Sequence, residues 1–134
     1  TGEIQCAAEK FVQYHTSLEV TMTALLKATL SMRTDRILVG KVREADALDL
    51  LDAWNTGHEG GAATLHANNA AAGLARLRSL ITRNESAPAE IEPLIGEVVH
   101  VVVHIARTPE GGRRIQEILE VSGYVDGRYI TKTL

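Results

Sequence analysis

Apolar side chains recur at steps of three and four residues along the first part of the chain, as on one face of an α-helix. With Thr16 and Glu19 in capping-box spacing, this pattern predicts a helix over residues 17–31. Three more helices are predicted in the same way: residues 44–55, a segment with an asparagine cap that carries residues 74–81, and a segment with Pro88 in its first turn.

Short runs of aliphatic and β-branched residues predict strands in the remaining segments. Ile37–Gly40 is an apolar run ended by glycine, typical of a strand buried on both faces, and a second short strand follows the glycine-rich residues 57–61. Later runs, separated by glycine-containing turns, predict strands joined by hairpins at residues 101–106, 114–121 and 128–131. Helices and strands that alternate first, followed by an antiparallel set, predict an α/β fold.

The composition fits one globular domain with an aliphatic core. The chain has 134 residues, of which 45% are hydrophobic, 4% aromatic and 23% charged. The formal net charge of -3 does not favour nucleic acid as a direct ligand, because phosphate neutralisation usually needs an excess of basic residues. The longest apolar stretch, Val98–Ala106, falls short of the about 20 residues of a membrane-spanning helix. The single cysteine, Cys6, excludes an internal disulfide and suits a reducing compartment.

A phosphate-binding loop of the Walker A type is not found in the sequence. Gly40-Lys41 is the only Gly-Lys pair, but Asp35 stands where the first glycine of that motif belongs, and Val42 stands where its hydroxyl residue belongs. We therefore expect the chain to have no P-loop of its own.

Histidines offer a metal-site alternative. His100 and His104 have helical ligand spacing, but the valines between them favour a strand, in which four residues span roughly 13 Å, too far to share one zinc ion. His58 and His66 remain as possible partners of Glu59, without a recognised ligand spacing. A metal-dependent hydrolase using these three residues is a further hypothesis.

Polar residues follow two of the predicted strands. In a parallel α/β sheet the ligand crevice lies outside the carboxyl ends of the strands. Residues 40–43 leave one strand and residues 65–68 leave another, so Arg43, His66 and Asn68 are candidates to converge on an anion. The alternative is a solvated arginine and an asparagine that merely caps a helix.

Three stretches stand in a characteristic order: Thr1–Gln5, then Leu30–Arg43, then Thr56–Gly61 continued by Thr64–Asn68. They resemble the end of the Asp box, the Walker B segment and the His box of the secretion and conjugation ATPases, the hexameric RecA-like motors of type II and type IV systems. Residues 47–58, with residues 90–107 behind them, are similar to the TrbB-type conjugal-transfer ATPases of that family.

The resemblance implies that residues 1–134 are the C-terminal part of a RecA-like P-loop NTPase domain, with a mostly parallel sheet flanked by helices and added antiparallel strands. The Walker A motif and an N-terminal domain would lie upstream. ATP and Mg²⁺ are the implied cofactors of the intact family member, with none tightly bound to this part alone. The implied partners are five further copies in a hexamer and inner-membrane secretion or conjugation components, at a cytoplasmic site peripheral to the inner membrane.

Functional residues carry over by position in the matching boxes. Glu3 matches the Asp-box glutamate that helps to position water and magnesium, and His66 matches the His-box histidine that contacts the γ-phosphate region. Arg33 and Arg43 match arginines near the phosphates or the subunit boundary. The residues expected at the nucleotide are Glu3, His66 and Arg43 for catalysis, and Arg33, Gly40, Lys41 and Asn68 for binding. No metal ligand is expected.

Lys41 departs from the family pattern. It stands where the Walker B segment carries a glutamate that orients water or the metal's shell. An ammonium group cannot accept a proton and repels magnesium, although it attracts a phosphate oxygen. We do not expect Glu44 or Asp46 in the next turn to replace it. Two hypotheses remain: part of an ATPase that couples hydrolysis to DNA or protein transfer and pilus biogenesis, or a catalytically degenerate RecA-like interaction module.

Overall fold

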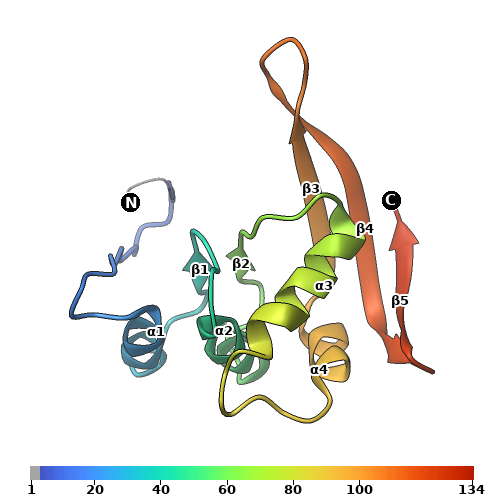
Figure 1. The fold of residues 1–134 in the computed structure, drawn as a ribbon. Coiled ribbons are helices and arrows are strands. Elements are labelled where there is room, and N and C mark those ends of the chain that lie inside the picture. Colours follow the sequence, from blue (N-terminus) through green and yellow to red (C-terminus); the bar gives the residue numbers. More distant parts are fainter. Residues whose placement is uncertain (1–3) are drawn as a thin grey trace.

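A computed structural model describes residues 4–134, which form helices alternating with a short parallel strand pair and then a three-stranded antiparallel sheet (Figure 1). The elements are α1 (Met22–Leu30), β1 (Leu38–Val39), α2 (Asp46–Asn55), β2 (Ala62–Ala63), α3 (Ala70–Ile81), α4 (Ile91–Val98), β3 (Val101–Arg107), β4 (Arg113–Val125) and β5 (Arg128–Thr133). The predicted α/β class is confirmed. None of the helices in this described part is long and apolar enough to span a membrane.

The first helix is shorter than the sequence pattern predicts. Thr21 caps α1, its hydroxyl accepting a hydrogen bond from the N–H of Ala24 at 3.2 Å. Ser17 accepts backbone N–H groups, including that of Val20, in a separate turn before the helix. The predicted start at residue 17 is therefore wrong by about one helical turn. Ser17 and Thr21 lie close together and both accept backbone N–H groups, but Thr21 is the residue that caps the helix.

The last predicted helix also begins later than expected. Glu90 is extended, with φ −114° and ψ 96°, and α4 starts at the next residue, so Pro88 lies in the preceding loop rather than in the first turn. The predictions for α2 and α3 are confirmed, and Asn69 caps α3 by accepting the N–H of Ala72 at 2.7 Å. A turn-favouring proline marks a helix start only to within a few residues.

The core lies between the helices and the inner face of the antiparallel sheet. Its largest fully buried side chains are aliphatic, as the low aromatic content predicts: Leu50, Leu51, Leu80, Ile81 and Ile95. At the interface of α4 and β4, a Cβ added to Gly96 would lie 2.8 Å from the carbonyl carbon of Gly123, so the helix backbone sits directly on the strand. Any larger residue at position 96 would push α4 away from the sheet.

The parallel pair joins β1 and β2 through α2. Leu38 pairs with Ala62 and Val39 with Ala63. Hydrogen bonding continues beyond the strands, because the Thr64 hydroxyl donates to the carbonyl of Gly40. The segments that follow β1 and β2 therefore run side by side. This arrangement places their polar residues at a common edge of the sheet.

The three-stranded sheet is antiparallel in the order β3-β4-β5, and both predicted hairpins are confirmed. Asp126 and Gly127, at φ 51° and 78°, form the tight β4–β5 turn. The expectation of a mostly parallel sheet is wrong for the described residues, because the parallel strands have two residues each whereas β4 alone has 13. Hairpin turns fix antiparallel partners locally, whereas a parallel partner must come from farther along the chain.

The antiparallel sheet has two unlike faces. Leu119 and Val121 are buried beneath the helices, and α3 is tied to the sheet where the N–H of Ala70 donates to Glu117 at 2.9 Å. The opposite side, here called the outer sheet face, carries large aliphatic side chains that are 41–56% exposed. Those side chains are Val101, Val103, Ile105, Ile115, Val125 and Ile130.

Candidate functional site

A pocket of about 340 Å³ lies where the chain leaves β1 and β2. Its lining residues are Lys41, Val42, Arg43, His66 and Arg76, and we call it the basic pocket. The predicted convergence of Arg43 and His66 at this sheet edge is thus observed in the structure, with Lys41 beside them. Their roles at a nucleotide stay predictions.

Backbone geometry turns Lys41 and Arg43 toward the pocket together. Val42 between them is only 4% exposed, and its N–H donates to the carbonyl of Thr64 at 2.8 Å. Because side chains alternate along an extended chain, burial of Val42 points both neighbours the other way. His66 lies two residues beyond Thr64, in the segment that follows β2, and lines the same pocket.

Arg76 is the lining residue that sequence reasoning missed. It lies on α3, one residue before buried Leu77 and three after buried Gly73. The position of Arg76 in the helical repeat could have indicated it. Arg76 lies beside the apolar stripe of the helix that follows His66, and such positions lie at the boundary between core and solvent. A rigid helix therefore adds a guanidinium group to a hollow otherwise built from strand ends.

Two residues expected at the nucleotide lie apart from this lining. Asn68 is exposed and precedes the true cap of α3, Asn69. Arg33 is exposed at φ 52° in the turn after α1. The lining of the basic pocket thus includes neither Asn68, which lies just before the cap of α3, nor Arg33, which lies in the turn after α1.

The other two expected residues are placed differently. Gly40 precedes the pocket, accepts the Thr64 hydroxyl, and would place an added Cβ 3.6 Å from the Ile4 side chain. Glu3 lies outside the described residues, so its predicted role at water and magnesium stays a prediction.

Close packing at the His box fixes the geometry of the β1–β2 pair. The indole Nε1–H of Trp54 donates to the carbonyl of Ile37 at 3.2 Å, so α2 is bonded to the chain just before β1. Gly61 passes beneath this contact, and a Cβ there would lie 2.1 Å from Trp54 Nε1 and 2.4 Å from the Ile37 oxygen. Only glycine fits at position 61, just before β2.

The structure does not gather the three residues of the metal-hydrolase hypothesis into a ligand group. Within residues 4–134 no group of three or more His, Cys, Asp or Glu side chains is placed to hold a metal ion. His58 has a buried Nδ1 with no hydrogen-bond partner among the described residues, Glu59 is exposed, and His66 lines the basic pocket. His104 lies in β3 and His100 just before it, as the strand prediction required.

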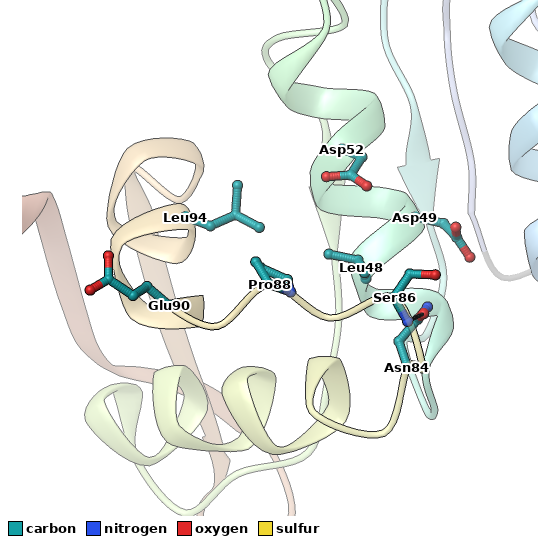
Figure 2. A pocket seen from close by; sticks show the side chains of 8 residues that line it. All are labelled: Leu48, Asp49, Asp52, Asn84, Ser86, Pro88, Glu90 and Leu94. Atoms are coloured by element: carbon teal, nitrogen blue, oxygen red, sulfur yellow. Dashed lines mark hydrogen bonds between the residues drawn. The ribbon is translucent and has the colours of Figure 1, made fainter.

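A second pocket, of about 390 Å³, opens between α2, the loop after α3, and α4 (Figure 2). Its lining residues are Leu48, Asp49, Asp52, Asn84, Ser86, Pro88, Glu90 and Leu94. Partial burial, and then the charge of Asp49, raise the pKa of Asp52 above its ordinary value of 3.8. Asp49 accepts a hydrogen bond from the hydroxyl of Thr23 at 2.6 Å, which joins α1 to α2. These carboxylates have structural partners or solvent, and no described cation lines this pocket with them.

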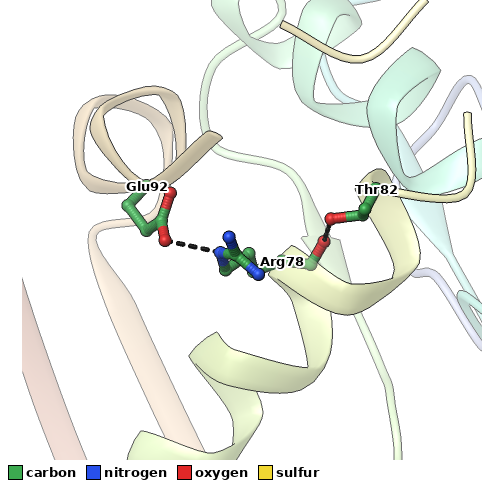
Figure 3. Close-up of polar contacts among 3 residues, drawn as sticks. All are labelled: Arg78, Thr82 and Glu92. Carbon is green, nitrogen blue, oxygen red and sulfur yellow. Dashed lines mark hydrogen bonds and ion pairs between the residues drawn. The ribbon is translucent and has the colours of Figure 1, made fainter. Parts of the chain in front are cut away.

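An ion pair between Arg78 and Glu92 joins α3 to α4 (Figure 3). A hydrogen bond to its own backbone, followed by the bond from Arg78, holds the pKa of Glu92 below 4.5. Arg78 therefore has a carboxylate partner. Within the described part of the chain, Lys41, Arg43 and Arg76 have none.

Comparison with known proteins assigns the family. Residues 1–122 match the family described as "Type II/IV secretion system protein". The chain therefore belongs to the type II/IV secretion proteins, as the order of its boxes predicts. Within that family it is 50% identical over 129 residues to the "Probable conjugal transfer protein TrbB" of Sinorhizobium fredii, a match that covers 96% of this chain and 39% of that protein.

More distant relatives lie in type IV secretion systems. The chain is 33% identical over 99 residues to the type IV secretion system protein PtlH of Bordetella pertussis, covering 71% of this chain and 29% of that protein. A crystal structure of the VirB11 ATPase of the Brucella suis type IV secretion system, in complex with sulphate, superposes with a TM-score of 0.69 at 33% identity. That superposition covers 75% of this chain and 32% of VirB11, so the chain spans less than half of each of these relatives.

Proposed function

We propose that this chain is the C-terminal, RecA-like part of a conjugal-transfer or type IV secretion ATPase. In this role it supplies the basic side of a nucleotide site, and the basic pocket receives the terminal phosphate of ATP. The whole protein works as a hexamer on the cytoplasmic side of the inner membrane, with components of the transfer apparatus as partners. Family membership and relatives named for conjugal transfer support this proposal.

The observation that carries the proposal is the convergence of Lys41, Arg43 and His66 at the carboxyl ends of two parallel strands. Ligands of open α/β sheets bind at that edge. The VirB11 ATPase structure was determined with sulphate, a tetrahedral oxyanion with the shape and charge of a phosphate group.

The residues present suit the electrostatic part of phosphoryl transfer. Such a reaction needs in-line positioning and neutralisation of charge on the equatorial oxygens, with little covalent work. Arg43 can donate two hydrogen bonds in a fixed fork, and the His66 imidazole can donate one to a phosphate oxygen. The chain offers no Walker A cradle of backbone N–H groups, so we expect the 134 residues alone to bind ATP weakly.

Magnesium fits the described residues poorly. The part of the pocket lining that residues 4–134 supply has no carboxylate, and Mg²⁺ prefers oxygen ligands. In the family this carboxylate is expected at position 41, where this chain has a lysine. We therefore assign no catalytic step of these residues to a metal ion.

Lys41 favours a second candidate, a non-hydrolysing RecA-like interaction module that responds to nucleotide without turning it over. Its ammonium group lies in the pocket lining itself rather than in solvent nearby, so the loss of the carboxylate affects the site directly. A lysine cannot act as the base or water-orienting group in that position.

A chimera tests both candidates. This chain replaces the matching segment of Sinorhizobium fredii TrbB, and ATP turnover is measured beside that of the parent protein. Turnover lost on His66→Ala supports the ATPase proposal. Turnover that arises only after Lys41→Glu supports the non-hydrolysing module. A folded chimera that neither binds nor hydrolyses ATP, with or without Lys41→Glu, overturns both.

A further inference from the structure

The cationic groups around the basic pocket come from three separate segments. Lys41 and Arg43 follow β1, His66 follows β2, and Arg76 lies on α3. Three of these four side chains are lysine or arginine, which carry a positive charge at neutral pH, and among residues 4–134 no acidic side chain lines the pocket. Three positive charges held around one hollow repel one another unless an anion lies between them.

The described residues around the pocket do not neutralise this charge. Within residues 4–134 the guanidinium that pairs with a carboxylate is that of Arg78, which points to Glu92 on α4. Arg76, two residues earlier on the same helix, lines the pocket instead. Lys41 is partly buried, so water screens its charge less than that of a fully exposed lysine.

Divalent metal ions are disfavoured at such a lining. A phosphate site that works through Mg²⁺ presents carboxylate or other oxygen ligands to the ion. Here the side chains present nitrogen donors, which hydrogen-bond phosphate oxygens directly. A metal ion already bound to the phosphates would add positive charge to a pocket that has an excess of it.

We propose that the basic pocket binds terminal phosphate groups of a polyphosphate directly and without a divalent cation, with Lys41 and Arg76 taking over the neutralising role of the metal. This inference rests on the proposed function only in assigning phosphate as the ligand. It adds Arg76 as a binding residue. It also gives Lys41 a positive role, because the lysine that removes a metal-positioning carboxylate supplies a direct phosphate contact.

Titration of the 134-residue chain with sodium tripolyphosphate tests the proposal. Binding is followed by calorimetry and by the NMR resonances of His66 and of the arginine side chains, first with a chelator and then with excess Mg²⁺. We expect saturable binding in chelator, and weaker binding in excess Mg²⁺ because the metal competes for the ligand. Binding that requires or is strengthened by Mg²⁺, or no saturable binding, overturns the proposal.

Arg76 is tested against a charge-matched control. We expect Arg76→Gln to weaken binding about fivefold, the effect of one exposed ionic contact, and Arg76→Lys to keep most of it. Arg128→Gln, in the β4–β5 hairpin, removes the same charge away from the pocket and should change affinity less than about twofold. Equal losses in the Arg76→Gln and Arg128→Gln variants would mean attraction by net charge alone, and the proposed site would be wrong.

Lys41→Glu separates the two roles of this position. The variant should lose tripolyphosphate binding in chelator and recover part of it when Mg²⁺ is added, because a carboxylate can hold the metal. Unchanged binding in chelator contradicts the role of Lys41. Amide NMR spectra establish that each variant is folded. The chimera assay gives an independent result, since its ATP turnover can fail while tripolyphosphate still binds here.

Discussion

Gly61→Ala is the sharpest test of how the fold positions the site. One added methyl group would lie 2.1 Å from Trp54 Nε1 and 2.4 Å from the carbonyl oxygen of Ile37. Both separations are more than 1 Å inside ordinary contact, since non-bonded carbon atoms pack about 3.5–4.0 Å apart. The indole ring must move away, and its hydrogen bond to Ile37 breaks.

Two costs add in this variant. Overpacking typically costs about 1–3 kcal/mol, and the lost hydrogen bond costs about 1 kcal/mol more. We expect Gly61→Ala to lower the free energy of unfolding by about 2–4 kcal/mol. For a chain of this length that corresponds to a fall in Tm of about 8–15 °C.

Urea unfolding followed by tryptophan fluorescence measures this free-energy change. The signal comes from the residue that the substitution displaces, because Trp54 is the single tryptophan of the chain. Gly112→Ala is the matched control: its Cβ would lie 3.4 Å from the Thr108 hydroxyl, so the expected change is within about 0.5 kcal/mol. In a Trp54→Phe background, the cost of Gly61→Ala should fall by about 1 kcal/mol. A Gly61→Ala variant as stable as the Gly112→Ala control would refute the packing argument.

Three further outcomes are expected. Ile95→Ala removes a fully buried side chain and should destabilise the protein by about 3 kcal/mol in urea unfolding. Tyr129→Phe should be neutral or stabilising by up to about 1 kcal/mol in thermal unfolding, because the buried Tyr129 hydroxyl has no partner among the described residues and burial raises its pKa to about 12. Glu92→Gln should cost about 0.5 kcal/mol at pH 7, the value of a solvent-screened pair with Arg78. Since the pKa of Glu92 is lowered in the folded state, that stabilisation is present above pH 4.5 and should disappear in acid titrations as the pH falls through the folded value.

Local signals in the sequence predicted local structure well. The three- and four-residue spacing of apolar side chains predicted α2 and α3, because each helix that packs in the core needs one buried apolar stripe. Asp126-Gly127 gave the β4–β5 turn because few residue pairs tolerate two successive positive φ angles. The start of α1 was missed because Ser17 and Thr21 are both able to accept N–H groups, and sequence alone does not say which begins the helix.

Tertiary arrangement was predicted only in part. Parallel strands were expected to place Arg43 and His66 together, and the β1–β2 pair does so. Arg76 was missed because its approach depends on how α3 crosses the strand ends, which no short motif encodes. Asn68 was placed at the anion although Asn69 is the residue that caps α3, a one-residue ambiguity in a pair of identical side chains.

The outer sheet face has a practical consequence for any phosphate experiment. Phosphate and sulphate are excluded from apolar surfaces and strengthen contacts between them, so exposed aliphatic residues such as Val103, Ile105 and Ile115 make salting-out a competing response to added oxyanion. Light scattering recorded along each titration, at several protein concentrations, tells true site occupancy from clustering of molecules. Replacement of Ile105 by lysine should delay the onset of turbidity while leaving the occupancy curve unchanged.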